Sequence, residues 1–305
     1  MAHCFHRLIL SMGVLAALLL VWLMPVAIAS ANSSLPEDSK TALHQGVTAF
    51  QNGDYPLAAE RFTQAVQSDP GYASAYSNRC LTYLELKAYQ TAIADCTQAL
   101  TLNSANTEAY LNRGLAHYRL HEYEAAIADY TELLKLKPYD YRAHYNRGLA
   151  QIDRGTYREA IVDFGEALRQ TSPLDRSTMA EIYSDRGLAQ LLFNHPQQAI
   201  ADLTQAIQLN SNHVGALYNR GCAYHQRGNN IAAINDFTQV LQRVPNHAHA
   251  YLSRGMIRYE QGAQSRAIAD LQQAAQFFQE QGLMLPYQQT LGLIEKMRSP
   301  SIAFG

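Results

Sequence analysis

Residues 107–140 read TEAYLNRGLAHYRLHEYEAAIADYTELLKLKPYD, and the same pattern of residue types returns every 34 residues along most of the chain. Seven such units align when they start at residues 39, 73, 107, 141, 180, 214 and 248. Position 20 is then alanine in every unit, from Ala58 to Ala267. A fixed period of this length indicates a stack of similar helical units, each of which packs on its neighbours.

Each unit is predicted to be a pair of antiparallel helices. Position 8, on the first helix, is glycine in six units and Cys80 in one, and position 20 lies on the second helix. These small residues allow the two backbones to approach closely. Turn residues such as Gly53 and Gly155 near position 15 end the first helix, and prolines such as Pro138 at position 32 end the second.

This pattern resembles the tetratricopeptide repeat family. Asn-Arg-Gly in first helices and Ala-Ile-Ala-Asp in second helices resemble bacterial, and particularly cyanobacterial, members. The chain departs from the family pattern by having tyrosine rather than tryptophan at position 4 and mostly arginine at position 7. The resemblance implies an all-α fold, a right-handed α-solenoid of about seven helix pairs. Its units would be 39–72, 73–106, 107–140, 141–179, 180–213, 214–247 and 248–281.

Two further segments belong to the predicted repeat region. Units four and five are 39 residues apart, and 173–179 accommodates the extra residues either as a tolerated loop or as a change of superhelical angle. Thr178 and Glu181 have the spacing of a capping box, which would start the fifth unit's helix early. After the last unit, residues 282–298 are predicted to form an amphipathic capping helix, followed by a tail at 299–305.

Residues 8–24 form an uncharged and almost wholly apolar run near the N-terminus. Small residues typical of a signal-peptide cleavage site follow it. The length of the run is also close to the shortest that spans a bilayer. Residues 1–31 are therefore interpreted as a signal peptide or an N-terminal membrane anchor, with 32–38 as a linker. Both interpretations predict export of the repeats to the periplasm, a thylakoid lumen or the extracellular space, with a membrane tether through residues 8–24 in the second.

The composition argues against several classes of protein. There are 24 Lys and Arg against 26 Asp and Glu, a net charge of −2, so the positive excess of nucleic-acid-binding proteins is missing. We find no nucleophile elbow and no phosphate-binding loop. His117 and His121 have the i,i+4 spacing of a helical metal pair, but no third ligand of fixed spacing accompanies them. The residues outside the repeats are too few for a catalytic domain. The sequence predicts no enzyme activity, no catalytic residue, no cofactor, no metal and no nucleic-acid partner.

The resemblance implies that one stripe of each first helix lines a concave groove. Position 6 of this stripe carries an asparagine in four units, and an asparagine can bond both the N–H and the C=O of an extended peptide. Aromatic residues at positions 5 and 12 would give the groove a partly apolar wall. The predicted groove residues are Asn78, Asn112, Asn146, Asn219, Asp185, Tyr118, Tyr145, Tyr218 and Tyr259. The alternative for the asparagines is bonding to neighbouring helices or water.

Arginine at position 7 and aspartate at position 23 occur together in six units. An unpaired charge beside the internally packed stripe would be costly, so an ion pair between the two helices of one unit is expected. We interpret these charges as structural. They include the pairs Arg113 and Asp129, Arg147 and Asp163, and Arg220 and Asp236.

Two cysteines replace the usual residues of one unit. Cys80 takes the place of the position 8 glycine and Cys96 that of the position 24 aromatic or aliphatic residue, two sites that face each other across the helix pair. Export would permit a disulfide between them. Two buried free thiols are the alternative, because facing helices restrict disulfide geometry.

Together these features predict a non-catalytic scaffold that binds an extended peptide or protein segment in its groove. A structural or assembly component of a membrane complex, using the convex face and the ends, is the alternative. An accessory subunit of an enzyme is a further one.

Overall fold

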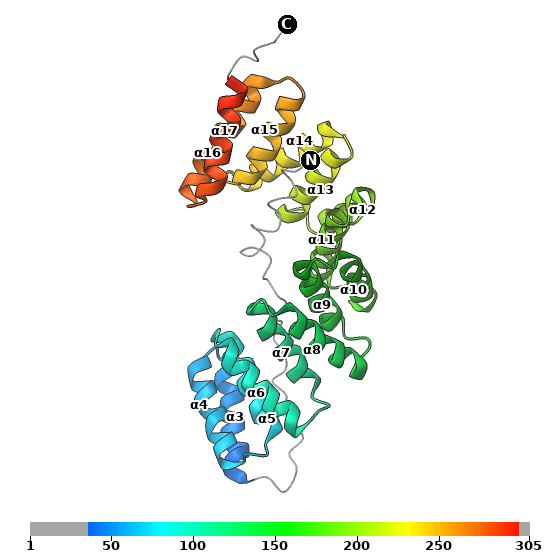
Figure 1. The fold of residues 1–305 in the computed structure, drawn as a ribbon. Helices are drawn as coiled ribbons and strands as arrows, with labels where there is room; N and C mark the ends of the chain where they lie inside the picture. The colour runs from blue at the N-terminus through cyan, green and yellow to red at the C-terminus, as the bar shows by residue number, and fades with distance from the viewer. Residues whose placement is uncertain (1–35, 299–305) are drawn as a thin grey trace. The chain divides into compact units, whose positions relative to one another are not determined.

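The computed structural model describes residues 36–298, and the regular secondary structure in this range is entirely helical, which confirms the all-α fold (Figure 1). The chain divides into two compact units after Gln170. The N-terminal unit contains α3 (Glu37–Gln51), α4 (Tyr55–Ser68), α5 (Ala73–Glu85), α6 (Tyr89–Leu102), α7 (Thr107–Arg119), α8 (Tyr123–Leu136), α9 (Tyr141–Arg154) and α10 (Tyr157–Gln170). The C-terminal unit contains α11 (Arg176–Leu192), α12 (Pro196–Leu209), α13 (Val214–Gln226), α14 (Asn230–Arg243), α15 (Ala248–Glu260), α16 (Gln264–Glu280) and α17 (Met284–Arg298).

Each repeat is a helix pair, from α3 with α4 in repeat one to α15 with α16 in repeat seven. The two helices are packed together because position 8 carries no side chain. A Cβ on Gly114 would lie 2.7 Å from the Tyr130 ring, and a Cβ on Gly148 would lie 2.8 Å from the Phe164 ring. Glycine is therefore required wherever a bulky position 24 side chain covers the first helix.

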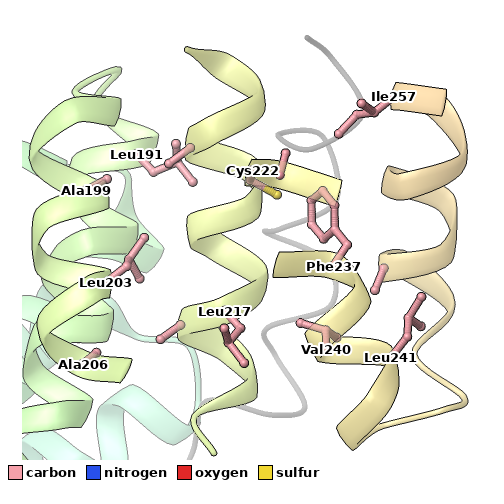
Figure 2. Close-up of a cluster of buried hydrophobic side chains, with 14 residues drawn as sticks. Leu191, Ala199, Leu203, Ala206, Leu217, Cys222, Phe237, Val240, Leu241 and Ile257 are labelled. Carbon is pink, nitrogen blue, oxygen red and sulfur yellow. The ribbon is translucent and has the colours of Figure 1, made fainter. Parts of the chain in front are cut away.

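Neighbouring repeats contribute side chains to the same hydrophobic clusters. Figure 2 shows this in the C-terminal unit, where Leu203 of α12 and Leu217 of α13 belong to the same cluster as Phe237 of α14 and Ile257 of α15. One cluster thus draws on repeats five, six and seven. A repeat removed from its neighbours would expose part of this cluster, so stability depends on stacking.

The turn inside each repeat has one geometry in all seven. Position 15 is left-handed throughout, and in four repeats it is glycine, which adopts this conformation without strain. The other three positions are Lys87, His121 and Asn194, with φ of 58°, 61° and 63°. A left-handed Lys87 or His121 was not predictable from residue type, because the packing of the repeat imposes the turn on whatever residue is there.

The extra residues between repeats four and five extend a helix. Helix α11 begins at Arg176, and the Asp175 side chain accepts a hydrogen bond from the Thr178 backbone N–H at 3.0 Å. The helix therefore starts early, but the expected capping box is wrong, because Asp175 is the cap and Thr178 is already inside the helix. The boundary between the two compact units lies next to this insertion.

The last helix, α17, packs on α16 and buries Ile294 and Met297. It begins at Met284, two residues after the predicted start. No helix within residues 36–298 is long and apolar enough to cross a membrane. The predicted signal or anchor segment, with its apolar run at 8–24, lies outside the described residues, as does the tail at 299–305.

Tyr130 offers a direct test of the packing between the helices of a repeat. Its hydroxyl is buried and has no hydrogen-bond partner within the described part of the chain, and burial raises its pKa. Phe62, Phe164 and Phe237 occupy the equivalent position elsewhere. We expect Tyr130→Phe to raise the free energy of unfolding by about 1 kcal/mol, because it removes an unsatisfied buried group.

The measurement is urea unfolding followed by circular dichroism. The matched control, Phe164→Tyr, should lower the unfolding midpoint, because it buries a new hydroxyl in the same place. A Tyr130→Phe protein less stable than wild type would contradict the packing described here.

Candidate functional site

The arginine of position 7 binds the aspartate of position 23 in the same repeat through two parallel hydrogen bonds. In repeat three, Arg113 Nε lies 2.9 Å from Asp129 Oδ2, and Nη2 lies 2.6 Å from Oδ1. Each aspartate is buried and each arginine is largely covered. The same arrangement is present in six repeats: Arg79–Asp95, Arg113–Asp129, Arg147–Asp163, Arg186–Asp202, Arg220–Asp236 and Arg254–Asp270.

The same arginines also bind the preceding repeat, which the sequence analysis did not anticipate. Arg113 Nη1 donates to Thr97 Oγ1 at 3.1 Å, and Thr97 belongs to repeat two. The recurring threonine at position 25 was the available signal. Five arginines make this bond, with Thr63, Thr97, Thr131, Thr204 and Thr238 as acceptors. For Arg186 the corresponding position 25 residue, in repeat four, is Gly165, which has no hydroxyl to accept this hydrogen bond.

Tyrosines complete the environment of the arginines. The Arg79 guanidinium lies 5.5 Å from the centre of the Tyr76 ring, and similar pairs surround Arg113, Arg186, Arg220 and Arg254. In repeat four, His144 replaces this tyrosine and approaches Asp163 Oδ1 at 2.9 Å. These arginines are thus paired with groups of the repeats themselves. Residues that bind a partner must therefore be sought among other side chains.

The first helices form a contiguous layer in the N-terminal unit. Helix α5 contacts α7, and α7 contacts α9, whereas the second helices have at most slight contact with one another. The layer carries the predicted asparagines Asn78, Asn112 and Asn146 at one register position of three successive repeats. We call these three residues the amide row. Asn219 occupies the same register on α13 in the C-terminal unit.

The amides are more buried than expected from a helical stripe alone. Asn78 and Asn112 are each 6% exposed, Asn219 is 5% exposed, and Asn146 is half-buried. The Nδ2 of Asn78 is fully covered, and no group in the described residues accepts a hydrogen bond from it. A buried donor without a partner costs about 1–3 kcal/mol. The Tyr130 hydroxyl is likewise buried without a partner among the described residues, so an unpaired atom alone does not mark a ligand site.

The three cations near this layer each lie near an acidic side chain. Arg142 lies 3.0 Å from Glu108 and 2.7 Å from Asp140, and Lys40 lies 3.9 Å from Glu37. Arg119 attracts Glu85 and opposes the rise that burial causes in the pKa of that carboxyl. The layer therefore presents amides and paired charges rather than a cluster of open positive charge.

The predicted aromatic residues fall into different environments. Tyr145 is only 4% exposed and packs on Phe164 at 5.8 Å between ring centres, so it lies in the core of repeat four. Tyr118 is half-buried, and its hydroxyl donates to Asp153 of the next repeat at 2.6 Å. Tyr145 cannot serve as a groove wall, because the neighbouring helices cover position 5 more closely than the predicted stripe assumed.

In the C-terminal unit, the Tyr218 ring stacks on His247 at 5.2 Å and its hydroxyl lies 3.3 Å from Ser253. Tyr259 is 44% exposed. Asp185 is half-buried on α11. Burial alone would lower the pKa of His213, but its hydrogen bond to Glu181 and the charges of Glu181 and Asp185 raise it. The surface here is more acidic than the amide row.

Cys80 and Cys96 are joined by a disulfide bond between α5 and α6, with 5.4 Å between their Cα atoms. Cys222 is a buried free thiol in the C-terminal unit. Within residues 36–298 no group of three or more His, Cys, Asp or Glu side chains is placed to hold a metal ion.

A family model described as "Tetratricopeptide repeat" matches residues 43–107, 111–176, 184–234 and 221–281, well over half of the chain. The chain belongs to this family. Both compact units consist of helix-pair repeats, as expected for this family. The predicted family assignment is confirmed. The bacterial style of the sequence stays a prediction.

Similar proteins agree with this assignment. The chain is 38% identical over 61 residues to Stress-induced-phosphoprotein 1 of Caenorhabditis elegans, a match that covers 20% of this chain and 19% of that protein. The chain thus spans about a fifth of that relative's length. A tetratricopeptide repeat protein from Parabacteroides merdae matches 84% of this chain and all of its own, at 21% identity and a TM-score of 0.63. YrrB, titled a TPR protein with an unusual peptide-binding site, matches 64% of this chain and 97% of its own, at 24% identity and a TM-score of 0.51.

The carboxyl of Asp163 predicts an acid dependence of stability. Burial alone would raise its pKa, but hydrogen bonds from His144 and Arg147 outweigh burial and lower the pKa below its usual value. The stabilisation is therefore fully present above the unfolded-state pKa of about 3.9 and is lost as the pH falls through the lower folded-state pKa.

We expect Asp163→Asn to cost about 3 kcal/mol at pH 7, because it leaves a largely covered arginine without its counter-charge. The variant should also lose less stability than wild type below pH 4. Urea unfolding between pH 2.5 and pH 7 measures both effects. Glu159→Gln, an exposed change on the same helix, is the control, and equal pH profiles for Asp163→Asn and wild type would refute the assignment.

Proposed function

We propose that the N-terminal unit binds an extended segment of a partner protein along α5, α7 and α9, with the amide row contacting the backbone of that segment. The observation that carries this proposal is the shared register of Asn78, Asn112 and Asn146, which places one asparagine on each of three successive first helices that contact one another. An extended backbone offers a carbonyl acceptor and an N–H donor at each residue, which matches both ends of an asparagine amide.

The charges around the row support a sequence-tolerant partner. Arg142 and Lys40 are engaged with acidic side chains, so recognition of a terminal carboxylate has little support. Each amide bond is worth about 0.5–1.5 kcal/mol net. Three of them suit weak binding that depends on the backbone of the ligand, with Tyr118 and its neighbours contacting side chains. Tyr145 is left out of the contact surface because its ring packs on Phe164 in the core of repeat four.

The C-terminal unit would contribute Asn219, Asp185, Tyr218 and Tyr259 to partner binding through its own first helices. We propose a non-catalytic role, since the polar and charged side chains discussed above either hold the repeats together or form the amide row. We also propose that the repeats are exported, which is supported by the apolar run at 8–24 and by the Cys80–Cys96 disulfide, a bond that forms in oxidising compartments.

The test is capture of partners from detergent-solubilised cells by tagged wild-type and variant chains. Asn78→Ala, Asn112→Ala and Asn146→Ala combined should reduce capture at least tenfold, because about 2–4 kcal/mol of hydrogen bonding is removed. Circular dichroism shows whether the variant remains helical. The matched control changes three exposed residues of second helices, Gln90→Ala, Arg158→Ala and Glu159→Ala, and should capture normally.

Unchanged capture by the folded asparagine variant would overturn the proposal. Loss of capture only in the control variant would favour the structural role in a larger assembly, in which the second helices and the ends make the contacts.

A further inference from the structure

Repeat two joins its helices differently from the other repeats. In four repeats a position 8 glycine lies directly against an aromatic ring of the second helix, as Gly148 lies against Phe164. In repeat two, Cys80 and Cys96 occupy these two positions and are bonded. The covalent bond therefore stands where other repeats have a packing contact. The four glycine–aromatic pairs are Gly46–Phe62, Gly114–Tyr130, Gly148–Phe164 and Gly221–Phe237.

Two free thiols would hold α5 and α6 together less well than either the disulfide bond or the glycine–aromatic contact of the other repeats. A cysteine side chain is much smaller than a phenylalanine, so without the bond the space between α5 and α6 would be filled less completely than in the other repeats. Loss of packing atoms in a core is destabilising. Both cysteines are fully buried, so the reduced pair would gain nothing from hydration while the helices stayed together.

We propose that the Cys80–Cys96 bond is a redox-sensitive lock on repeat two. A dithiol reductant would break the S–S bond, and the two electrons and two protons it gives up would leave two thiols on the protein and one disulfide on the reductant. Reduction frees α5 to separate from α6, although Arg79 still bonds Asp95 beside the cysteines. The released repeat is held by that ion pair and its remaining apolar contacts.

Burial of the sulfurs determines how the lock is opened. A thiolate must reach a sulfur to attack it, and neither cysteine is accessible in the folded repeat. Reduction must therefore follow a local opening of α5 and α6, and it should be slow under native conditions. In a chain that folds in a reducing compartment, the Cys80–Cys96 bond would not form, and repeat two would be unlocked from the start.

The lock has a consequence for the amide row. Asn78 lies on α5 two residues before Cys80, so the order of this helix fixes the first amide of the row. This consequence rests on the proposed function, whereas the lock itself does not.

The experiment compares oxidised and reduced protein by thermal unfolding and hydrogen–deuterium exchange. Wild type is reduced with dithiothreitol in urea, refolded in its presence, and alkylated to show that both cysteines are free. We expect the unfolding midpoint to fall by about 5–10 °C, and exchange in α5 and α6 to rise at least tenfold. Cys222, buried in the other unit, should resist alkylation in the refolded protein and so reports any global unfolding.

A rebuilt variant is the matched control. Cys80→Gly with Cys96→Phe restores the glycine–phenylalanine contact of the other repeats, so it should keep α5 and α6 protected with or without dithiothreitol. Cys80→Ser with Cys96→Ser should resemble reduced wild type. Reduced wild type with the midpoint and the exchange of the oxidised protein would overturn the lock. That failure is seen in the unfolding midpoint and in the exchange, whereas the proposed function fails in the capture experiment.

Discussion

The hydrogen-bonded arginine of position 7 is the interaction on which the stacking of repeats depends. One guanidinium joins three helices, because Arg113 binds Asp129 of its own repeat and Thr97 of the repeat before it. The planar group has donors on several sides, which suits a residue that must bond two partners in different directions. Paired in this way, a largely covered charge is tolerated and fixes the register between repeats.

This use of arginine determines what remains for function. The family resemblance implied a groove lined by one stripe of each first helix. The structure shows those arginines bonded within the repeats, while asparagines occupy the first-helix layer of the N-terminal unit. The covered Nδ2 of Asn78 is one of several buried polar atoms without a hydrogen-bond partner among the described residues, and the Tyr130 hydroxyl is another.

The sequence predicted the fold well because its signals are local and repeated. Position 8 glycines and position 20 alanines have one explanation, close approach of two helices, and the Cys80–Cys96 positions face each other for the same reason. Contacts between repeats were harder to predict. Thr97 recurs with the other position 25 threonines, but the sequence does not show that stacking brings it to Arg113 of the next repeat. Tyr145 was misplaced because a helical stripe does not reveal how far neighbouring helices cover it.

The departures from regularity have physical causes of the same kind. Lys87 and His121 adopt a left-handed turn because each repeat needs that turn at position 15. Gly165 removes the threonine hydroxyl immediately before the chain divides into its two compact units. In repeat two a covalent bond replaces a packed ring. Each departure changes one contact while the pairing of helices is kept.

The central claim is that Thr97 and Asp129 stabilise the stack through one shared guanidinium. A double-mutant cycle on Thr97→Val and Asp129→Asn, measured by urea unfolding, tests it most directly. Two partners of Arg113 should be coupled, so the double variant should differ from the sum of the single variants by about 0.5–1.5 kcal/mol. Strict additivity of the two changes would contradict the claim, because it would mean that the two residues stabilise the fold independently.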